Sequence, residues 1–155
     1  MSEIWVLVDK AQDVVRNVTY EGLAAALKLK EKNGATVCAI YVGDNAGAIE
    51  ADLGKYGAEK FYKVENPALS DFNPSLYATA LSEVIKKHNP DIVIGGNTLK
   101  NQDYLPRVAS RTSAGLSLDS IDVCSVTHPD WCMLIREKQK IIPILKKITL
   151  GIIIR

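Results

Sequence analysis

The side chains best suited to chemistry stand in a glycine-rich stretch that follows the apolar run 92–94. Gly96 lets a ligand approach the backbone closely, and Thr98 and Lys100 can hold an anion together with the start of a following helix. Asn101 extends the same polar stretch. Neither G-x-G-x-x-G nor the Walker pattern G-x-x-x-x-G-K-[ST] is present. The stretch therefore predicts an anion or nucleotide site without a diagnostic phosphate motif.

Two further loops follow strand-like apolar runs. Asp9 ends the first run of the chain, and Gly43 ends the second, with Asp44 directly after it. The Asp9 carboxylate can contact a ribose or cap the following loop, and the residue pattern leaves both interpretations open. Ligands in open α/β sheets bind beyond the carboxyl ends of the strands, so we expect Asp9, Gly43 and the Gly96 stretch to lie together.

The histidines and cysteines form no catalytic or metal-binding pattern. His88 falls on the apolar side of a predicted helix, and His128 has no nucleophile beside it. Cys38, Cys124 and Cys132 are widely spaced and odd in number, so we expect reduced thiols and neither a disulfide framework nor a zinc site. Hydrolytic catalysis has no support without G-x-S-x-G or a cysteine beside a base. The residues leave the question of an enzyme open and favour a protein that is not one.

Length and composition predict one domain spanning residues 1–155. We also expect it to be cytoplasmic. A chain of 155 residues with 47% hydrophobic and 24% charged side chains can bury one core. The N-terminus shows neither a basic leader nor an apolar signal core, and the stretch 141–154 is too short and too interrupted to span a bilayer. We therefore expect no membrane insertion. Apolar strand runs contain Trp5, Tyr41, Phe61 and Tyr62, so we expect these aromatic side chains to be core and to form no nucleic-acid platform.

Charge is unevenly distributed along the chain. Residues 136–155 carry six Lys or Arg against Glu137 alone, whereas residues 1–135 carry 13 basic and 17 acidic side chains. A basic tail can meet nucleic acid, an anionic membrane surface or an acidic protein. Lysine-rich edge strands also discourage aggregation between sheets, and we favour this explanation.

Strand-like and helix-like segments alternate up to residue 126, which predicts an α/β fold with a doubly wound, mostly parallel sheet and helices on both faces. The clearest helix is capped by Asn73, has Pro74 in its first turn and is ended by Asn89 and Pro90. A polar loop is expected between Asp9 and the first helix. The predicted strands are 4–8, 36–42, 56–64, 92–94 and 121–126, and the predicted helices are 19–33, 43–53, 74–88 and 104–112.

The pattern changes after Pro129. The segments 131–135, 141–145 and 148–154 are rich in β-branched residues and are separated by short turns without a helix. This favours antiparallel hairpins, added to the parallel sheet at its C-terminal end. Their isoleucines would supply an exposed sheet surface on which a partner or a second copy can pair.

Four elements together carry a family resemblance. They are Tyr56-Gly-Ala-Glu-Lys, Thr98, Leu105-Pro-Arg-Val-Ala-Ser and Gly115-Leu-Ser-Leu-Asp. In order and spacing, over roughly residues 1–126, they resemble the N-terminal domain of the electron transfer flavoprotein alpha subunit. The resemblance implies a Rossmann-like domain related to the adenine nucleotide alpha hydrolase and universal-stress-protein group, which pairs with a beta subunit.

The resemblance also implies FAD, held mainly by a C-terminal domain with which the family would continue after Arg155. Two departures from the family pattern stand out. Family members have Gly followed by Lys or Arg before the Pro-Arg-Val-Ala block, where this chain has Asn101-Gln102 and its basic group at Lys100. Asn tolerates the left-handed conformation that such a glycine can adopt. The family's R-P-x-Y-x-G segment is reduced to Arg136-Glu137.

Arg107 carries over directly from the family motif. Its planar guanidinium can bridge Asp103, Asp119 and loop carbonyls, or it can bind a ligand, and we favour the bridging role. Pro106 fits the first turn of the helix predicted to follow the loop, where its missing N–H costs little.

Two functions follow as hypotheses. In the first, the chain is an assembly or interaction module in flavin-dependent electron transfer, colourless alone, with a beta-subunit-like protein or a second copy as its partner. It would then be a natural short protein or part of a split or truncated alpha subunit. In the second, it is a small adenine-nucleotide-binding domain of universal-stress-protein type that holds AMP or a related nucleotide. Gly151 alone does not supply the glycine-rich phosphate motif common in such proteins.

Overall fold

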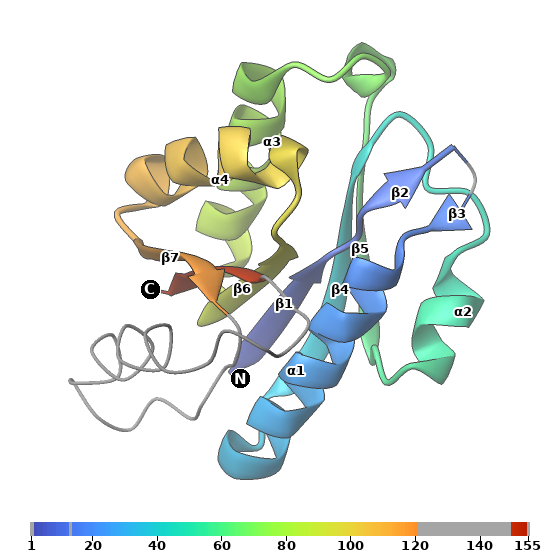
Figure 1. The fold of residues 1–155 in the computed structure, drawn as a ribbon, viewed down its shortest axis with the longest axis vertical. Helices are drawn as coiled ribbons and strands as arrows, with labels where there is room; N and C mark the ends of the chain where they lie inside the picture. Colours follow the sequence, from blue (N-terminus) through green and yellow to red (C-terminus); the bar gives the residue numbers. More distant parts are fainter. Residues whose placement is uncertain (1, 13, 121–149, 155) are drawn as a thin grey trace.

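A computed structural model describes residues 2–12, 14–120 and 150–154 of the chain (Figure 1). Strands and helices alternate along most of this length, as the sequence predicts. The strands are β1 (Glu3–Leu7), β2 (Lys10–Ala11), β3 (Val14–Val15), β4 (Thr36–Gly43), β5 (Lys60–Glu65), β6 (Ile92–Gly96), β7 (Gly115–Ser120) and β8 (Leu150–Ile154). The helices are α1 (Asn17–Asn33), α2 (Glu50–Lys55), the 3-10 turn η1 (Pro67–Leu69), α3 (Pro74–His88) and α4 (Leu99–Thr112).

The main sheet has six strands in the order β5-β4-β1-β6-β8-β7. β1, β4, β5 and β6 are parallel, which confirms the mostly parallel sheet predicted from the sequence. The chain moves from β1 to β4 and β5 on one side, and then returns to place β6 on the other side of β1. The strand order therefore reverses between β1 and β6, where open α/β sheets place their ligands.

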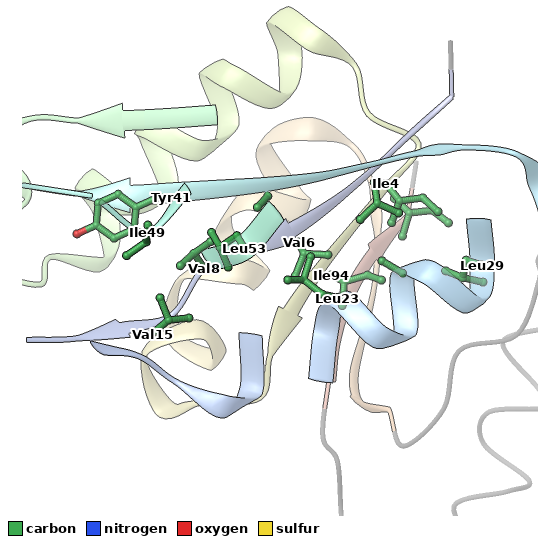
Figure 2. Close-up of a cluster of buried hydrophobic side chains, with 14 of the residues drawn as sticks. Ile4, Val6, Val8, Val15, Leu23, Leu29, Tyr41, Ile49, Leu53 and Ile94 are labelled. Carbon is green, nitrogen blue, oxygen red and sulfur yellow. The ribbon is translucent and has the colours of Figure 1, made fainter. Parts of the chain in front are cut away.

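Helices cover both faces of the parallel strands (Figure 1). Successive side chains of a strand point to opposite faces. Ile4 and Val6 of β1 accordingly pack with Leu23 of α1, in the buried cluster shown in Figure 2. Trp5 and Leu7 pack on the other face, in the cluster that includes α3 and α4. Because β1 is buried on both faces, its sequence is a continuous apolar run.

Local chemistry sets the ends of two helices. The Asn73 side chain accepts hydrogen bonds from the backbone N–H groups of the first turn of α3, and Pro74 is the first helical residue. Asn89 ends α3 in a left-handed conformation, with φ 55°. Gly34 ends α1 in the same way, with φ 68°. These signals confirm the predicted end of α1 and both predicted ends of α3.

α4 differs from the sequence prediction. The prediction of a helix from residue 104 with Pro106 in its first turn is wrong, because α4 begins at Leu99 and contains Pro106 in its interior. The cause is the Thr98 side chain, which accepts a hydrogen bond from the backbone N–H of Asn101 and starts the helix early. Proline lacks an N–H, so the carbonyl four residues before it has no intrahelical donor at Pro106.

Three other predicted elements begin or end elsewhere. The polar loop expected after Asp9 contains a short antiparallel hairpin, β2 and β3. The helix predicted for 43–53 is restricted to Glu50–Lys55. The strand predicted from Tyr56 begins at Lys60, because residues 56 and 57 form a turn.

The C-terminal strand is an interior strand of the sheet. β8 is antiparallel to both β6 and β7 and lies between them, and it overlaps the predicted segment 148–154. Both backbone edges of β8 are therefore occupied, and β5 and β7 form the edges of the described sheet. The predicted segments 121–126, 131–135 and 141–145 lie outside the described residues.

Candidate functional site

Most of the candidate residues meet at the carboxyl edge of the sheet. β4, β1 and β6 are neighbours and run in the same direction, so their ends bring Gly43, Asp9 and Gly96 to one edge. Two residues separate β6 from α4, which adds Lys100 and its cap Thr98 to the same edge. The structure thus brings together the three loops that the sequence predicts to converge.

Asp9 is buried at this edge, with 7% of its surface exposed. Its backbone N–H donates to Thr19 Oγ1 at 2.9 Å, and its carbonyl accepts from the backbone N–H of Arg16 at 2.8 Å. The carboxylate oxygen Oδ2 is shielded from solvent and has no hydrogen-bond partner. The Arg16 guanidinium lies 3.6 Å from Oδ2. The Asp9 backbone therefore closes the loop, and Oδ2 retains an unused acceptor position.

Lys100 lies over aromatic rings in the first turn of α4. Its Nζ is 4.2 Å from the centroid of the Tyr77 ring and 5.4 Å from that of Phe72. Cation–π attraction holds an ammonium group in such a position. Burial lowers the pKa of Lys100, while the negative charges of Asp9 and Asp44 oppose this shift. The charges of Asp9 and Asp44 therefore act on the Lys100 ammonium.

Two buried tyrosines of α3 and α4 pack against each other, and Lys100 lies over one of them. Tyr104 of α4 and Tyr77 of α3 have ring centroids 5.8 Å apart. Burial raises the pKa of Tyr104 far above its ordinary value, and the charge of Asp9 adds to the shift. Burial also raises the pKa of Tyr77, with smaller contributions from Tyr41 and Asp44. The charge of the Asp9 carboxylate thus acts on Tyr104, on the face of the sheet that α3 and α4 cover.

Asn101 has a structural role in the first turn of α4. Its side-chain Nδ2 donates to the carbonyl of Gly96 at 2.8 Å, and Asn101 is itself buried. Its backbone is helical and is not among the described positions with positive φ. The departure from the family's glycine therefore needs no left-handed conformation here. Asn101 instead ties the start of α4 to the end of β6.

The candidate glycines have packing reasons to be glycine. A Cβ atom on Gly96 would collide with the methyl groups of Val18 in α1. A Cβ atom on Gly43 would collide with the ring and hydroxyl of Tyr41. Both glycines thus allow a close approach within the protein. Ligand contact at these two positions stays a prediction.

Arg107 lies apart from the Asp9 and Lys100 cluster, at the joint between α3 and α4. Its Nε donates to the carbonyl of Asp103 at 3.3 Å, and its guanidinium lies 3.5 Å from the Asp103 carboxylate. It also donates to Ser75 Oγ of α3 at 3.4 Å. These contacts support the bridging role of Arg107 through Asp103. The side chain of Asp119, the other predicted partner, lies outside the described part of the structure.

Comparison with known proteins places the chain in a family. The model of the electron transfer flavoprotein domain matches residues 4–130, which is more than half of the chain. The chain belongs to the electron transfer flavoprotein family. The match covers all four elements of the resemblance, from Tyr56 to Asp119.

The relatives include alpha subunits of electron transfer flavoproteins. The chain is 37% identical over 117 residues to the alpha subunit of Thermoanaerobacterium thermosaccharolyticum, covering 76% of this chain and 36% of the relative. It is 35% identical over 125 residues to the alpha subunit of Bacillus subtilis, covering 81% and 38%. It is also 29% identical over 117 residues to the acryloyl-CoA reductase electron transfer subunit beta of Anaerotignum propionicum, covering 76% and 32%. The chain thus spans about a third of the length of these relatives, and it corresponds to the N-terminal part of the alpha subunit.

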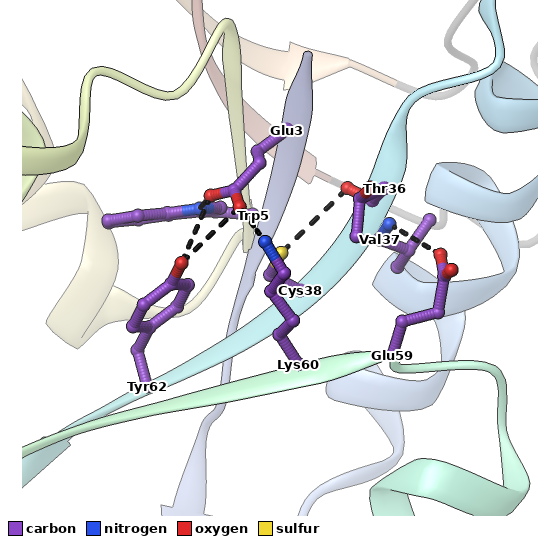
Figure 3. A network of polar contacts seen from close by, with 8 residues as sticks. All are labelled: Glu3, Trp5, Thr36, Val37, Cys38, Glu59, Lys60 and Tyr62. Carbon is purple, nitrogen blue, oxygen red and sulfur yellow. Dashed lines mark hydrogen bonds and ion pairs between the residues drawn. The ribbon is translucent and has the colours of Figure 1, made fainter. Parts of the chain in front are cut away.

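One residue of the Tyr56 to Lys60 element, Lys60, takes part in a hydrogen-bond network at the opposite edge of the sheet (Figure 3). The Glu3 carboxylate accepts hydrogen bonds from Trp5 Nε1 at 2.8 Å and from Lys60 Nζ at 2.6 Å. Tyr62 Oη donates to the same carboxylate at 3.2 Å. This network was not predicted from the sequence. The charged Glu3 at the start of a buried strand could have indicated such a network. Its partner Lys60, however, lies 57 residues away along the chain.

The described residues contain no group of three or more histidines, cysteines or acidic side chains placed to hold a metal ion. Within the same part of the chain, no helix is long and apolar enough to cross a membrane. His88 packs at a tilt against Tyr62 and Trp5, with ring centroids 4.9 and 5.8 Å away. This packing agrees with the prediction that His88 lies on the apolar side of its helix. His128, Cys124 and Cys132 lie outside the described residues.

Proposed function

We propose that the chain is an assembly and interaction module of a flavin-dependent electron transfer system, and that it does not hold FAD by itself. The match to the electron transfer flavoprotein domain over residues 4–130 carries this proposal. The alpha-subunit relatives are more than twice as long as the region they share with this chain. We assign the main FAD contacts of such a system to the region that the match does not cover.

The proposed partner is a beta-subunit-like protein. The relatives are named as alpha subunits, so they work with other subunits, and this chain has their N-terminal part. The alternative partner is a second copy that pairs through the C-terminal strands. Both edges of β8 are occupied, so such pairing would use β7 or residues outside the described ranges. A cytoplasmic location is part of the same proposal.

Co-expression tests the partner directly. The tagged chain is expressed with the beta-subunit homologue of its own organism and analysed by size-exclusion chromatography with light scattering. We expect a stable complex with one copy of each chain. A full-length alpha subunit added in excess should displace the chain, because both contain the matched region. Separate elution of the two proteins at micromolar concentration would count against the proposed partner.

A further inference from the structure

We propose that Ser75 is a phosphorylation site whose phosphate is held by Arg107 and Arg111, at the joint between α3 and α4. Ser75 is exposed in the first turn of α3, so its hydroxyl is open to a modifying enzyme. This modification is separate from the proposed assembly role and from the loops at the carboxyl edge of the sheet. The contacts between the two helices support it.

Two arginines of α4 lie against two hydroxyl groups of α3. Arg107 donates to Ser75 Oγ at 3.4 Å, and one turn later Arg111 donates to Thr79 Oγ1 at 2.6 Å. Arg111 also donates to the backbone carbonyl of Ser75 at 3.5 Å. Residues four apart lie on the same side of a helix, so one turn of α3 matches one turn of α4. Both guanidinium groups therefore lie beside a group attached to Ser75.

Positive charge at this joint exceeds negative charge. Arg107 lies 3.5 Å from the Asp103 carboxylate, and both of these side chains are about half exposed. Arg111 donates to neutral oxygen atoms and makes no ion pair within the part of the chain that the structure describes. A phosphate on Ser75 would bring about 1.5 to 2 negative charges at pH 7 and three acceptor oxygens. It would therefore replace long contacts to neutral atoms with charge-assisted hydrogen bonds.

Ser75 suits this modification better than Thr79. The Thr79 hydroxyl already donates to the Ser75 carbonyl at 2.8 Å and accepts from Arg111. Ser75 Oγ accepts a long hydrogen bond from Arg107. The backbone N–H of Ser75 donates to the Asn73 side chain at 3.0 Å. The start of α3 is thus already capped, and the arginines are the groups that would hold the phosphate.

A kinase that uses a nucleoside triphosphate would supply the phosphate. The Ser75 oxygen forms a bond to the γ-phosphorus, the bond from that phosphorus to the bridging oxygen breaks, and a nucleoside diphosphate leaves. The hydroxyl proton passes to a base of the kinase and then to water. Free phosphate must compete with water for two exposed arginines, whereas a phosphate attached to Ser75 stays beside them at a high effective concentration. The attached group therefore fits this joint better than a free anion.

Thermal unfolding tests the contact between the phosphate and the arginines. The full chain is made with phosphoserine incorporated at position 75 by codon suppression, and circular dichroism compares its melting temperature with that of the unmodified chain. We expect the phosphate on Ser75 to raise the melting temperature by about 3–6 °C, because it ties α3 to α4. The rise should fall to about half or less in Arg107→Gln and in Arg111→Gln.

A phosphate on Ser70 is the matched control. Ser70 is exposed at the end of η1 and contacts no arginine among the described residues. Surface changes away from specific contacts alter stability little. The phosphate on Ser70 should therefore leave the melting temperature unchanged to within about 1 °C.

Labelling tests whether the modification takes place. The chain is incubated with an extract of its own organism and with ATP labelled in the γ-phosphate, and mass spectrometry locates the labelled residue. We expect label on Ser75. This label should be lost in Ser75→Ala and kept in Ser70→Ala.

Four results would overturn the proposal. The first is a melting temperature that the phosphate on Ser75 lowers or leaves unchanged. The second is an undiminished rise in both arginine variants, and the third is no label on Ser75. The fourth is an equal rise caused by millimolar inorganic phosphate in Ser75→Ala, which would leave a simple anion site. None of these measurements involves FAD or a beta subunit, so failure of this site and failure of the assembly role remain distinguishable.

Discussion

The contacts of Glu3 explain the direction in which folding shifts the pKa of its carboxyl group. Its side chain is only 12% exposed, and it accepts hydrogen bonds from Trp5, Lys60 and Tyr62 (Figure 3). Burial alone would raise the pKa of Glu3, but the hydrogen bonds and the charge of Lys60 outweigh it. The net result is a pKa of Glu3 below its ordinary value of 4.5. The ionised form therefore stabilises the folded state.

This shift predicts a pH-dependent effect of Glu3→Gln. A carboxyl group whose pKa is lowered by folding stabilises the protein above its unfolded pKa, and the stability is lost as the pH falls. At pH 7 we expect Glu3→Gln to lower the free energy of unfolding by about 1 kcal/mol. Urea unfolding of both proteins at pH 7 and pH 3 measures the difference. It should be smaller at pH 3 than at pH 7, because the stabilisation by the ionised form is lost as the pH falls toward and through the lowered pKa of Glu3.

Glu83→Gln is the matched control for this prediction. Glu83 is exposed on α3 and makes only a surface ion pair with Lys86. Such pairs contribute little, so Glu83→Gln should unfold like the original chain at both pH values. A deficit of Glu3→Gln that is equal at pH 7 and pH 3 would mean that packing, and not the charge of Glu3, is responsible.

Between elements, α1 packs closely on β6 at Gly96. A Cβ on Gly96 would meet the methyl groups of Val18, so the two elements pack at the separation that glycine allows. Gly96→Ala should lower the free energy of unfolding by about 1–3 kcal/mol. Combining it with Val18→Ala should recover part of the loss. Thermal and urea unfolding of the single and double variants measure this coupling.

Gly54 in α2 offers the matched control. A Cβ there has nothing within 4 Å, and glycine is a poor helix former. Gly54→Ala should leave stability unchanged or raise it by about 0.5–1 kcal/mol. If Gly96→Ala and Gly54→Ala behave alike, the close packing of α1 on β6 does not limit stability.

Elements with strong local signals were predictable from the sequence. Asn73, Pro74 and Asn89 fixed both ends of α3 because each acts on its own backbone or on that of its neighbours. α4 was misplaced because Pro106 is a strong local signal for a helix start, whereas the cap at Thr98 depends on a single side chain. The hairpin of β2 and β3 was missed because four strand residues carry almost no periodicity.

At the scale of the molecule, the meeting of the strand ends was predictable but their detailed chemistry was not. Parallel strands place their carboxyl ends at one edge, so Asp9, Gly43 and Gly96 had to converge once the sheet was recognised as parallel. The sequence did not indicate that the Asp9 carboxylate would lack a hydrogen bond, or that Lys100 would lie on Tyr77. Those contacts depend on how α3 and α4 pack together. The position of β8 inside the sheet likewise depends on long-range pairing.

The whole-molecule account is tested most directly by the absorption spectrum of the purified chain after incubation with excess FAD and desalting. The same spectrum is recorded for the purified complex with a beta-subunit homologue, and for a full-length alpha subunit with its own beta subunit as the positive control. If the chain is an assembly module that does not hold FAD by itself, the chain alone will show protein absorption and no flavin band. A flavin band that survives desalting, with about one FAD for each chain, would contradict that account.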